Sequence, residues 1–151
     1  MSLREQITKD QINAMKAGEK ARLSTIRLLL SAAKYKEVDL KRLLTDEEVV
    51  ELIGTLIRQR QDSVEQFTLG KRLDLADKES AEIEVLRGYL PPQLSADEVR
   101  EIVKKCADET GAAGMKDMGK LMKAVQPLTK GKADGKAVAD AVKAALGGLE
   151  V

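Results

Sequence analysis

Six lysines between residues 116 and 136 are the clearest candidates for chemistry with a ligand. They are Lys116, Lys120, Lys123, Lys130, Lys132 and Lys136. On a helical projection the first three gather on one side, and the other three surround two glycines, Gly131 and Gly135. A turn that leads into a helix exposes backbone N–H groups, and the helix dipole there favours anions. This combination is typical of a site that binds phosphate groups.

The same lysines also fit a simpler interpretation, in which they are the solvated charges of an amphipathic helix. The other side of that helix is apolar, carrying Met115, Met118, Met122 and Val125. Gly119 lies between the two sides, where the missing side chain would let another backbone approach closely. We expect Pro127 to end this helix and Asp134 to cap the next one.

Catalysis finds little support in the sequence. The chain has no histidine, which removes the commonest general base and the commonest zinc ligand. It contains no P-loop, no GxGxxG and no CxxC. The single cysteine, Cys106, is predicted to be a small buried hydrophobe because it lies on the apolar side of its helix. We therefore predict no catalytic residue, no cofactor and no metal site.

Two charged residues interrupt apolar stripes in the first half of the chain. Arg60 projects into the stripe of one predicted helix, and Glu79 projects into the stripe of the next, with Glu82 at its edge. An ion pair between Arg60 and Glu79 would satisfy both groups. Such a pair is predicted to have a structural role, since nothing nucleophilic accompanies it.

Helices must position all of these residues. Aromatic side chains are scarce, and strands are enriched in aromatic and β-branched residues, so the composition favours an all-α fold. Three capping boxes mark helix starts: Ser2 with Glu5, Thr45 with Glu48, and Ser95 with Glu98. Glycines mark several helix ends.

The segment from Tyr89 to Pro92 interrupts the helical pattern, because prolines cannot continue a helix. We place a domain boundary there, with Tyr89 and Pro91 as structural residues. Residues 1–92 are predicted to form a bundle of about four helices, and residues 93–148 a three-helix domain. Residues 149–151 are set apart as a tail or added remnant.

Length and charge set the remaining expectations. The net charge is +1, with acidic residues in excess between 74 and 110 and basic ones towards both ends. This asymmetry permits a nucleic-acid partner without requiring one. No apolar run has the length of a membrane span or the position of a secretory signal. A cytoplasmic protein that does not enter membranes is therefore expected.

Three sequence pieces resemble one known family: YLP at 89–91, MGKLM at 118–122 and GKADGK at 131–136. With the surrounding residues they are similar, over nearly the whole chain, to the stand-alone YqeY proteins of the GatB/YqeY family. The resemblance implies an all-helical protein with an N-terminal helical domain and a smaller C-terminal one.

The family also includes the C-terminal tail of the GatB component of the glutamine-dependent aspartyl/glutamyl-tRNA amidotransferase, and this tail helps that enzyme engage tRNA. The catalytic part of GatB has no counterpart here, so the resemblance implies an association with carbon–nitrogen ligation rather than the chemistry itself. Where the amidotransferase tail usually has asparagine-proline, this chain has Asp134-Gly135, as stand-alone members do.

The leading hypothesis is a non-catalytic accessory protein of translation that binds tRNA phosphates through the six lysines. Its expected partners are tRNA and a tRNA-charging or amidotransferase enzyme. The alternative is a module that docks a partner through Met115, Met118, Leu121 and Met122, and burial of these side chains would argue against it. A third possibility is a component of an assembled amidotransferase.

Overall fold

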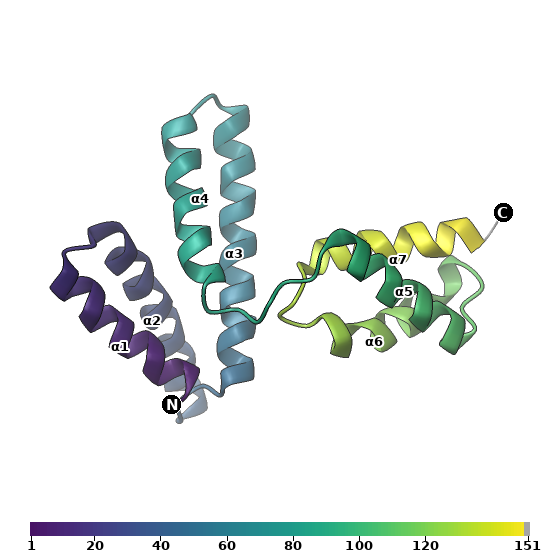
Figure 1. Ribbon diagram of the computed structural model, residues 1–151, viewed down its shortest axis with the longest axis horizontal. Coiled ribbons are helices and arrows are strands. Elements are labelled where there is room, and N and C mark those ends of the chain that lie inside the picture. Colours follow the sequence, from purple (N-terminus) through teal and green to yellow (C-terminus); the bar gives the residue numbers. More distant parts are fainter. Residues whose placement is uncertain (150–151) are drawn as a thin grey trace. The chain divides into compact units, whose positions relative to one another are not determined.

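The computed structural model describes residues 1–149, and this part of the chain contains helices and no strand (Figure 1). The predicted all-α fold class is therefore confirmed. A short 3₁₀ helix, η1, accompanies the α-helices. In chain order the elements are α1 (Leu3–Ala17), α2 (Lys20–Leu40), α3 (Asp46–Leu69), α4 (Leu73–Arg87), α5 (Ala96–Thr110), η1 (Met115–Asp117), α6 (Met118–Thr129) and α7 (Gly135–Leu149).

The predicted capping boxes start α1, α3 and α5. In each, the hydroxyl of the cap residue accepts from the backbone N–H of the glutamate, whose carboxylate accepts from the backbone N–H of the cap residue. These reciprocal bonds satisfy donors that a helix start leaves without an intrahelical partner. The capping prediction is confirmed at all three positions.

The chain separates into two compact units, the first running from Met1 to Leu90 and the second beginning at Pro91. In the first unit, α1 packs beside α2, and α3 packs beside α4 (Figure 1). Its core draws on all four helices, with Ile7, Ile26, Ile53 and Leu86 almost fully buried. Burial of such aliphatic side chains is the main stabilising contribution to a helical bundle of this size.

The second unit packs α5, α6 and α7 around a core without charged side chains. Val103, Leu121, Val125 and Val142 are almost fully buried. Cys106 is buried among them, as predicted, and this burial raises the pKa of its thiol. A raised thiol pKa makes the nucleophilic thiolate scarcer at neutral pH.

The helix predicted to include Met115 and to end at Pro127 differs from the structure at both ends. Residues 115–117 form η1, and α6 begins only at Met118. Pro127 lies inside α6, which continues to Thr129, so the predicted end at Pro127 is wrong. The fixed φ of proline is compatible with a helix, and in the last turn the missing N–H removes a single hydrogen bond. The N–H of Lys130 still closes the helix on the carbonyl of Gln126 at 2.9 Å.

Leu149, the first residue of the predicted tail, belongs to α7, and the other two tail residues lie outside the described residues. Within residues 1–149, no helix combines the length and the apolar character needed to cross a membrane.

Candidate functional site

The six lysines predicted to contact phosphate all have exposed side chains. Lys116 lies in η1, Lys120 and Lys123 lie in α6, and Lys136 is the second residue of α7. Lys130 and Lys132 belong to the segment that connects α6 to α7. Exposure of this kind is required for contacts with a polyanion, and it is equally what solvated surface lysines show.

The connection between α6 and α7 is a tight turn with defined hydrogen bonds. The carbonyl of Thr129 accepts from the N–H groups of Lys132 and Ala133, at 2.9 and 3.0 Å. Gly131 has a φ of 74°, in the left-handed region that glycine adopts with little strain. The turn therefore holds the backbone of Lys132 in one place, although its side chain extends into solvent.

Two residues after the prolines fix this turn from outside. The side-chain amide of Gln93 donates to the carbonyl of Gly131 at 2.9 Å and to that of Pro91 at 2.8 Å. The N–H of Leu94 donates to the carbonyl of Lys132 at 2.7 Å. Sequence reasoning missed both contacts, because no local pattern signals a bond between residues 38 positions apart.

Helix α7 begins directly after this turn. Asp134 occupies the position before its first residue, and the Asp134 carbonyl accepts from the N–H of Val138 at 3.0 Å. A side chain added at Gly135 would meet no neighbouring atom within 4 Å, so the start of the helix is open. The first N–H groups of any helix lack intrahelical partners. Here they lie next to Lys132 and Lys136, which are both exposed.

The apolar side of α6 faces the core of the second unit. Leu121 is fully buried, and Met118 and Met122 are partly buried against the same cluster. Met115 is 40% exposed. Most of the surface that the docking alternative requires is thus occupied by the protein itself. Gly119 faces open space, because a methyl group added there would meet no neighbouring atom within 4 Å. No backbone within the described residues makes the close approach expected at Gly119.

Arg60 has an acidic partner in a half-buried position, and that partner is Glu82. The Arg60 Nε lies 2.9 Å from a Glu82 carboxylate oxygen, and Arg60 Nη1 donates to the carbonyl of Leu56. The predicted pair with Glu79 is therefore wrong. Glu79 and Glu82 lie on the same side of α4, one turn apart. The register of α3 against α4 brings Glu82, rather than Glu79, within hydrogen-bond distance of Arg60.

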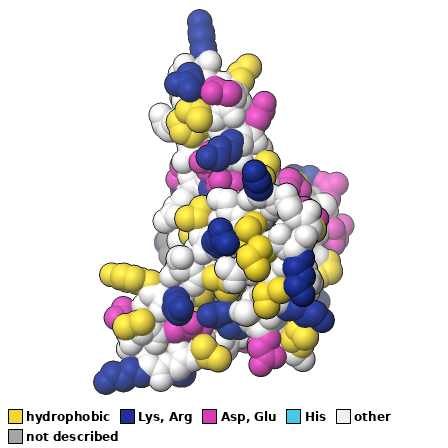
Figure 2. Space-filling model, turned by 90° about the vertical axis from the view of Figure 1, so that its left-hand side faces the viewer, with side chains coloured by type: hydrophobic (Ala, Val, Ile, Leu, Met, Phe, Trp, Pro, Cys, Tyr) yellow, Lys and Arg dark blue, Asp and Glu magenta, His cyan; other side chains and the backbone are white. Residues whose placement is uncertain are grey.

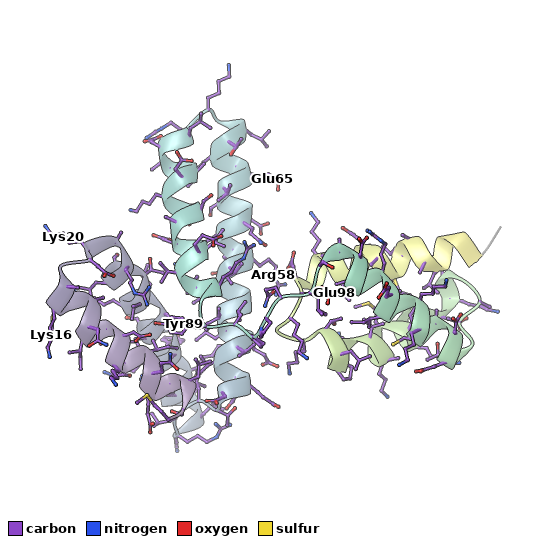
Figure 3. All side chains as sticks on the ribbon, viewed as in Figure 1. Lys16, Lys20, Arg58, Glu65, Tyr89 and Glu98 are labelled. Carbon is purple, nitrogen blue, oxygen red and sulfur yellow. The ribbon has the colours of Figure 1, made fainter. Side chains whose placement is uncertain are left out.

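Tyr89 lies just beyond α4 and ties that end of the helix to α1 (Figure 3). Its hydroxyl donates to the Asp10 carboxylate at 2.7 Å. Partial burial raises the pKa of Tyr89, and the hydrogen bond to Asp10 raises it further. This contact accounts for a structural role of Tyr89 within the first unit.

The first unit also contains a charged network that the sequence analysis missed. Glu37 is 8% exposed and accepts two hydrogen bonds from Arg4, at 3.0 and 3.2 Å. It accepts a third from the N–H of Leu44 at 3.0 Å. Burial acts to raise the pKa of Glu37, but the bonds from Arg4 and Leu44 outweigh it and hold the pKa below its ordinary value. The carboxylate thereby joins α1, α2 and the loop before α3.

Comparison with known proteins identifies similar chains. A family model described as Yqey-like protein matches residues 4–146. An uncharacterized protein of Schizosaccharomyces pombe is 35% identical over 94 residues, which cover 62% of this chain and 76% of that protein. A protein of Pyrenophora tritici-repentis named altered inheritance of mitochondria protein 41, mitochondrial, is 34% identical over 126 residues.

That match covers 82% of this chain and 69% of the Pyrenophora protein. A protein of Lachancea thermotolerans with the same name is 42% identical over 85 residues, covering 56% of this chain and 46% of the relative. The chain thus spans between about half and three quarters of the length of these curated relatives.

The names of these relatives overturn one prediction. Both proteins named after altered inheritance of mitochondria are described as mitochondrial, so the cytoplasmic prediction is wrong. That prediction rested on the missing apolar leader of a secretory signal. A mitochondrial targeting segment is amphipathic and rich in arginine, so the test for a secretory signal does not address it.

Proposed function

This chain belongs to the Yqey-like protein family, and on that premise we propose that it is a tRNA-binding accessory protein without catalysis of its own. It binds the phosphate backbone of tRNA through the lysine surface, defined as Lys116, Lys120, Lys123, Lys130, Lys132 and Lys136. The observation that carries the proposal is the exposure of all six lysines, three of which, Lys130, Lys132 and Lys136, lie at a turn whose backbone is fixed by Gln93 and Leu94.

The composition of the second unit supports recognition by charge and shape. All three aromatic residues of the chain precede Pro91, so the second unit has no aromatic side chain on which a base could stack. Lysine contacts to phosphate carry no sequence information and release counterions on binding. The affinity should therefore depend steeply on salt and only weakly on the sequence of the RNA.

The second part of the proposal concerns a partner enzyme. We propose that the protein presents tRNA to a glutamine-dependent tRNA amidotransferase or another tRNA-charging enzyme, an idea based on the resemblance of its C-terminal half to the amidotransferase tail. Co-elution of the purified chain with amidotransferase subunits in the presence of tRNA tests this part. Elution of the chain apart from those subunits would refute the proposed partner enzyme but would not bear on the proposal that the chain binds tRNA.

The decisive experiment measures binding of unmodified tRNA across a salt series. The test variant changes Lys116, Lys120, Lys123 and Lys132 to glutamine. The matched control removes the same charge from exposed lysines of the first unit, with Lys9, Lys16, Lys71 and Lys78 changed to glutamine. If four phosphate contacts are lost, the slope of log K against log salt should fall by about 3 in the test variant.

We expect the affinity of the test variant to drop about tenfold or more at low salt, because each lysine contributes through counterion release. The control should bind tRNA nearly as well as the unmodified protein. Equal losses in the two variants would mean that net charge alone attracts RNA. Undiminished binding in the test variant would refute the lysine surface as the site.

A further inference from the structure

Helix α2 has apolar residues on two opposite sides, and only one of them is buried in the first unit. The buried side carries Thr25, Ile26, Leu29, Ala33 and Glu37. The opposite side carries a line of exposed residues, which we call the outer seam. The outer seam consists of Ser24, Leu28, Ser31, Tyr35 and Val38.

The larger side chains of the outer seam are strongly exposed. Leu28 is 49% exposed, Tyr35 78% and Val38 73%. Single exposed apolar side chains are common on protein surfaces, but a line of them along one helix marks an interaction site more specifically. Ser24 and Ser31 alternate with the larger residues and leave room between them.

A row of cations runs beside the outer seam at intervals of seven residues. The cation row consists of Lys20, Arg27, Lys34 and Lys41. All four are exposed. Lys20, Arg27 and Lys34 lie within α2 and span about 21 Å at a rise of 1.5 Å per residue, whereas Lys41 caps the C-terminal end of the helix with a left-handed φ of 58°. None of the ion pairs formed within residues 1–149 includes a member of this row.

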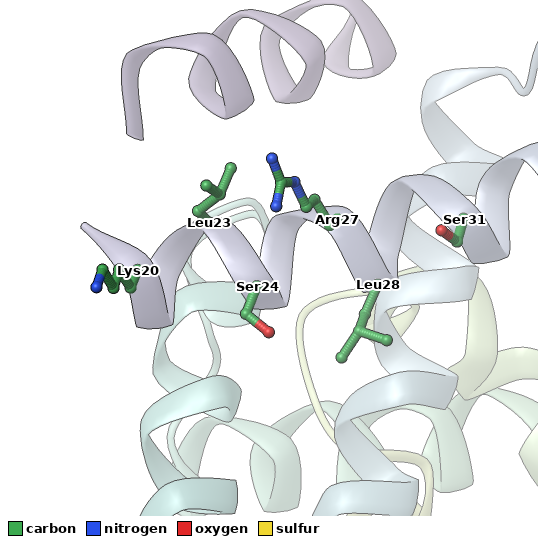
Figure 4. Close-up of a pocket in the computed structure, with 6 residues that line it drawn as sticks. All are labelled: Lys20, Leu23, Ser24, Arg27, Leu28 and Ser31. Carbon is green, nitrogen blue, oxygen red and sulfur yellow. The ribbon is translucent and has the colours of Figure 1, made fainter. Parts of the chain in front are cut away.

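The seam and the row border a shallow groove of about 320 Å³ (Figure 4). Its lining residues all come from α2, and they include Lys20 and Arg27 of the row with Ser24 and Leu28 of the seam. Arg27 also lines a neighbouring groove of about 380 Å³, together with Arg4 of α1 and Lys34. Figure 2 looks onto the side of the molecule where α1 and α2 lie, and basic side chains there are interspersed with hydrophobic ones.

The spacing of the seam is that of a coiled-coil contact. Its members are separated by four, three, four and three residues, which keeps them on one line facing a partner helix. In that arrangement the cation row occupies a flanking position of the coiled coil, where charged residues determine which partner helix binds. A flank with cations at every heptad selects carboxylates on the opposing helix.

We propose that the outer seam and the cation row together bind an amphipathic helix of a partner protein, with aliphatic side chains on the seam and glutamate or aspartate facing the row. This surface lies in the first unit, so the inference does not depend on the lysine surface of the second. With this surface, the first unit can bind a partner protein while the lysine surface of the second unit binds RNA.

Two other occupants fit the surface less well. A second copy of the chain in antiparallel pairing would set the cation row against itself, and like charges in register repel. In parallel pairing, the flank opposite the row consists of Thr25, Ala32 and Asp39, of which Thr25 is buried in the first unit and only Asp39 is a carboxylate. An RNA strand would use the cations but would leave Leu28 and Val38 without partners.

The test selects binders from a displayed library of 24-residue helices against the immobilised full chain. The library fixes leucine, isoleucine or valine at the two seam-facing positions of each heptad and randomises the flanks among glutamate, lysine, glutamine and alanine. We expect selected helices to be enriched in glutamate on one flank. Their affinity should fall about tenfold or more when Arg27 and Lys34 are both changed to glutamate, because attraction becomes repulsion.

A matched control changes Lys9 and Lys16 of α1 to glutamate, and it should retain affinity within about twofold because those exposed lysines lie outside the row. The Arg27→Glu, Lys34→Glu variant should regain binding to a helix whose flanking glutamates are replaced by lysines. Replacing Leu28 and Val38 by serine should also weaken binding about tenfold, since it removes the apolar contact. All variants are first checked for unchanged helix content.

Four outcomes would overturn the proposal. In the first, the selected helices show no preference for acidic flanks. In the second, their affinity is unchanged by the α2 substitutions, and in the third it is unchanged when Leu28 and Val38 are replaced. In the fourth, the free protein self-associates and the α2 substitutions abolish that self-association. The last would make the surface an interface between copies. If Arg27→Glu with Lys34→Glu lowers tRNA affinity while no helix is selected, the row binds RNA and the proposal also fails.

Discussion

The two units of this protein use charged side chains for different purposes. In the first unit, Arg4 with Glu37 and Arg60 with Glu82 join separate helices in buried or half-buried ion pairs. In the described part of the second unit, Arg100 pairs with Asp97, one turn apart on the surface of α5. Ion pairs thus join helices inside the first unit, whereas the second unit packs around an apolar core and its six lysines are exposed.

Truncation of the apolar core of the second unit should give the largest effect. Leu121→Ala removes a fully buried side chain and leaves a cavity, so it should lower the free energy of unfolding by about 3 kcal/mol. Hydrogen exchange resolved by residue would show whether the loss is confined to the second unit. Met115→Ala, at a 40% exposed position, is the control and should change little. If Leu121→Ala lowered the free energy of unfolding only slightly, the second unit would not depend on this core for its stability.

Removal of Glu37 tests whether the stability of the first unit depends on its buried ion pairs. Glu37→Ala leaves the Arg4 guanidinium and the Leu44 N–H without their partner, so it should cost about 2 to 3 kcal/mol. Glu65→Ala, at an exposed site on α3, is the matched control and should stay within about 0.5 kcal/mol. If chemical denaturation gave the same small value for both variants, the network would not hold the unit together.

Acidification should weaken the first unit through the same carboxylate. The pKa of Glu37 is lower in the folded protein than in the unfolded chain, so its contribution is complete above roughly pH 4.3 and is lost as the pH falls through the folded value. Glu48, which is partly exposed, acts in the same direction, because Arg42 and the N–H of Thr45 lower its pKa to about 2. Urea unfolding at a series of pH values measures this effect. Below roughly pH 4.3 the free energy of unfolding of the Glu37→Gln variant should fall less steeply than that of the unmodified protein.

The coupling of Arg60 with Glu82 should be smaller but specific. A double-mutant cycle with Arg60→Met and Glu82→Gln should give a coupling free energy of about 1 to 2 kcal/mol, since both side chains are mostly buried. The same cycle with Glu79→Gln should give a value near zero. Equal coupling for the two glutamates would contradict the observed register of α3 and α4.

Neutralisation of the lysine surface should have the smallest effect on stability. Changing Lys116, Lys120, Lys123 and Lys132 to glutamine removes exposed charges, so the free energy of unfolding should change by less than about 0.5 kcal/mol. Thermal unfolding measures this directly. A loss as large as that of Glu37→Ala would show that these lysines serve the fold, and the contrast between the two units would disappear.

Local patterns predicted much of the fold correctly. The capping boxes at Ser2, Thr45 and Ser95 are present because a cap depends on residues three positions apart. The buried position of Cys106 follows from helical periodicity in the same way. Pro127 was misread because a proline near a helix end costs one hydrogen bond, which the surrounding packing of α6 offsets.

The partners of charged groups were harder to predict. Arg60 was identified as a residue that needs a carboxylate, but choosing Glu82 over Glu79 requires the register between two helices. The network around Glu37 and the contacts of Gln93 with Gly131 bring together residues far apart in the chain. Such contacts leave no periodic trace in either segment.

The sequence by itself determined the helices, their caps and the positions of the lysines, because these depend on side chains within a few residues of one another. Only the tertiary structure decided which carboxylate Arg60 meets, how the turn at Gly131 is fixed, and which side of α2 stays uncovered. Those outcomes depend on how whole helices pack. Apolar residues on both sides of a helix do not reveal which side its neighbours will bury.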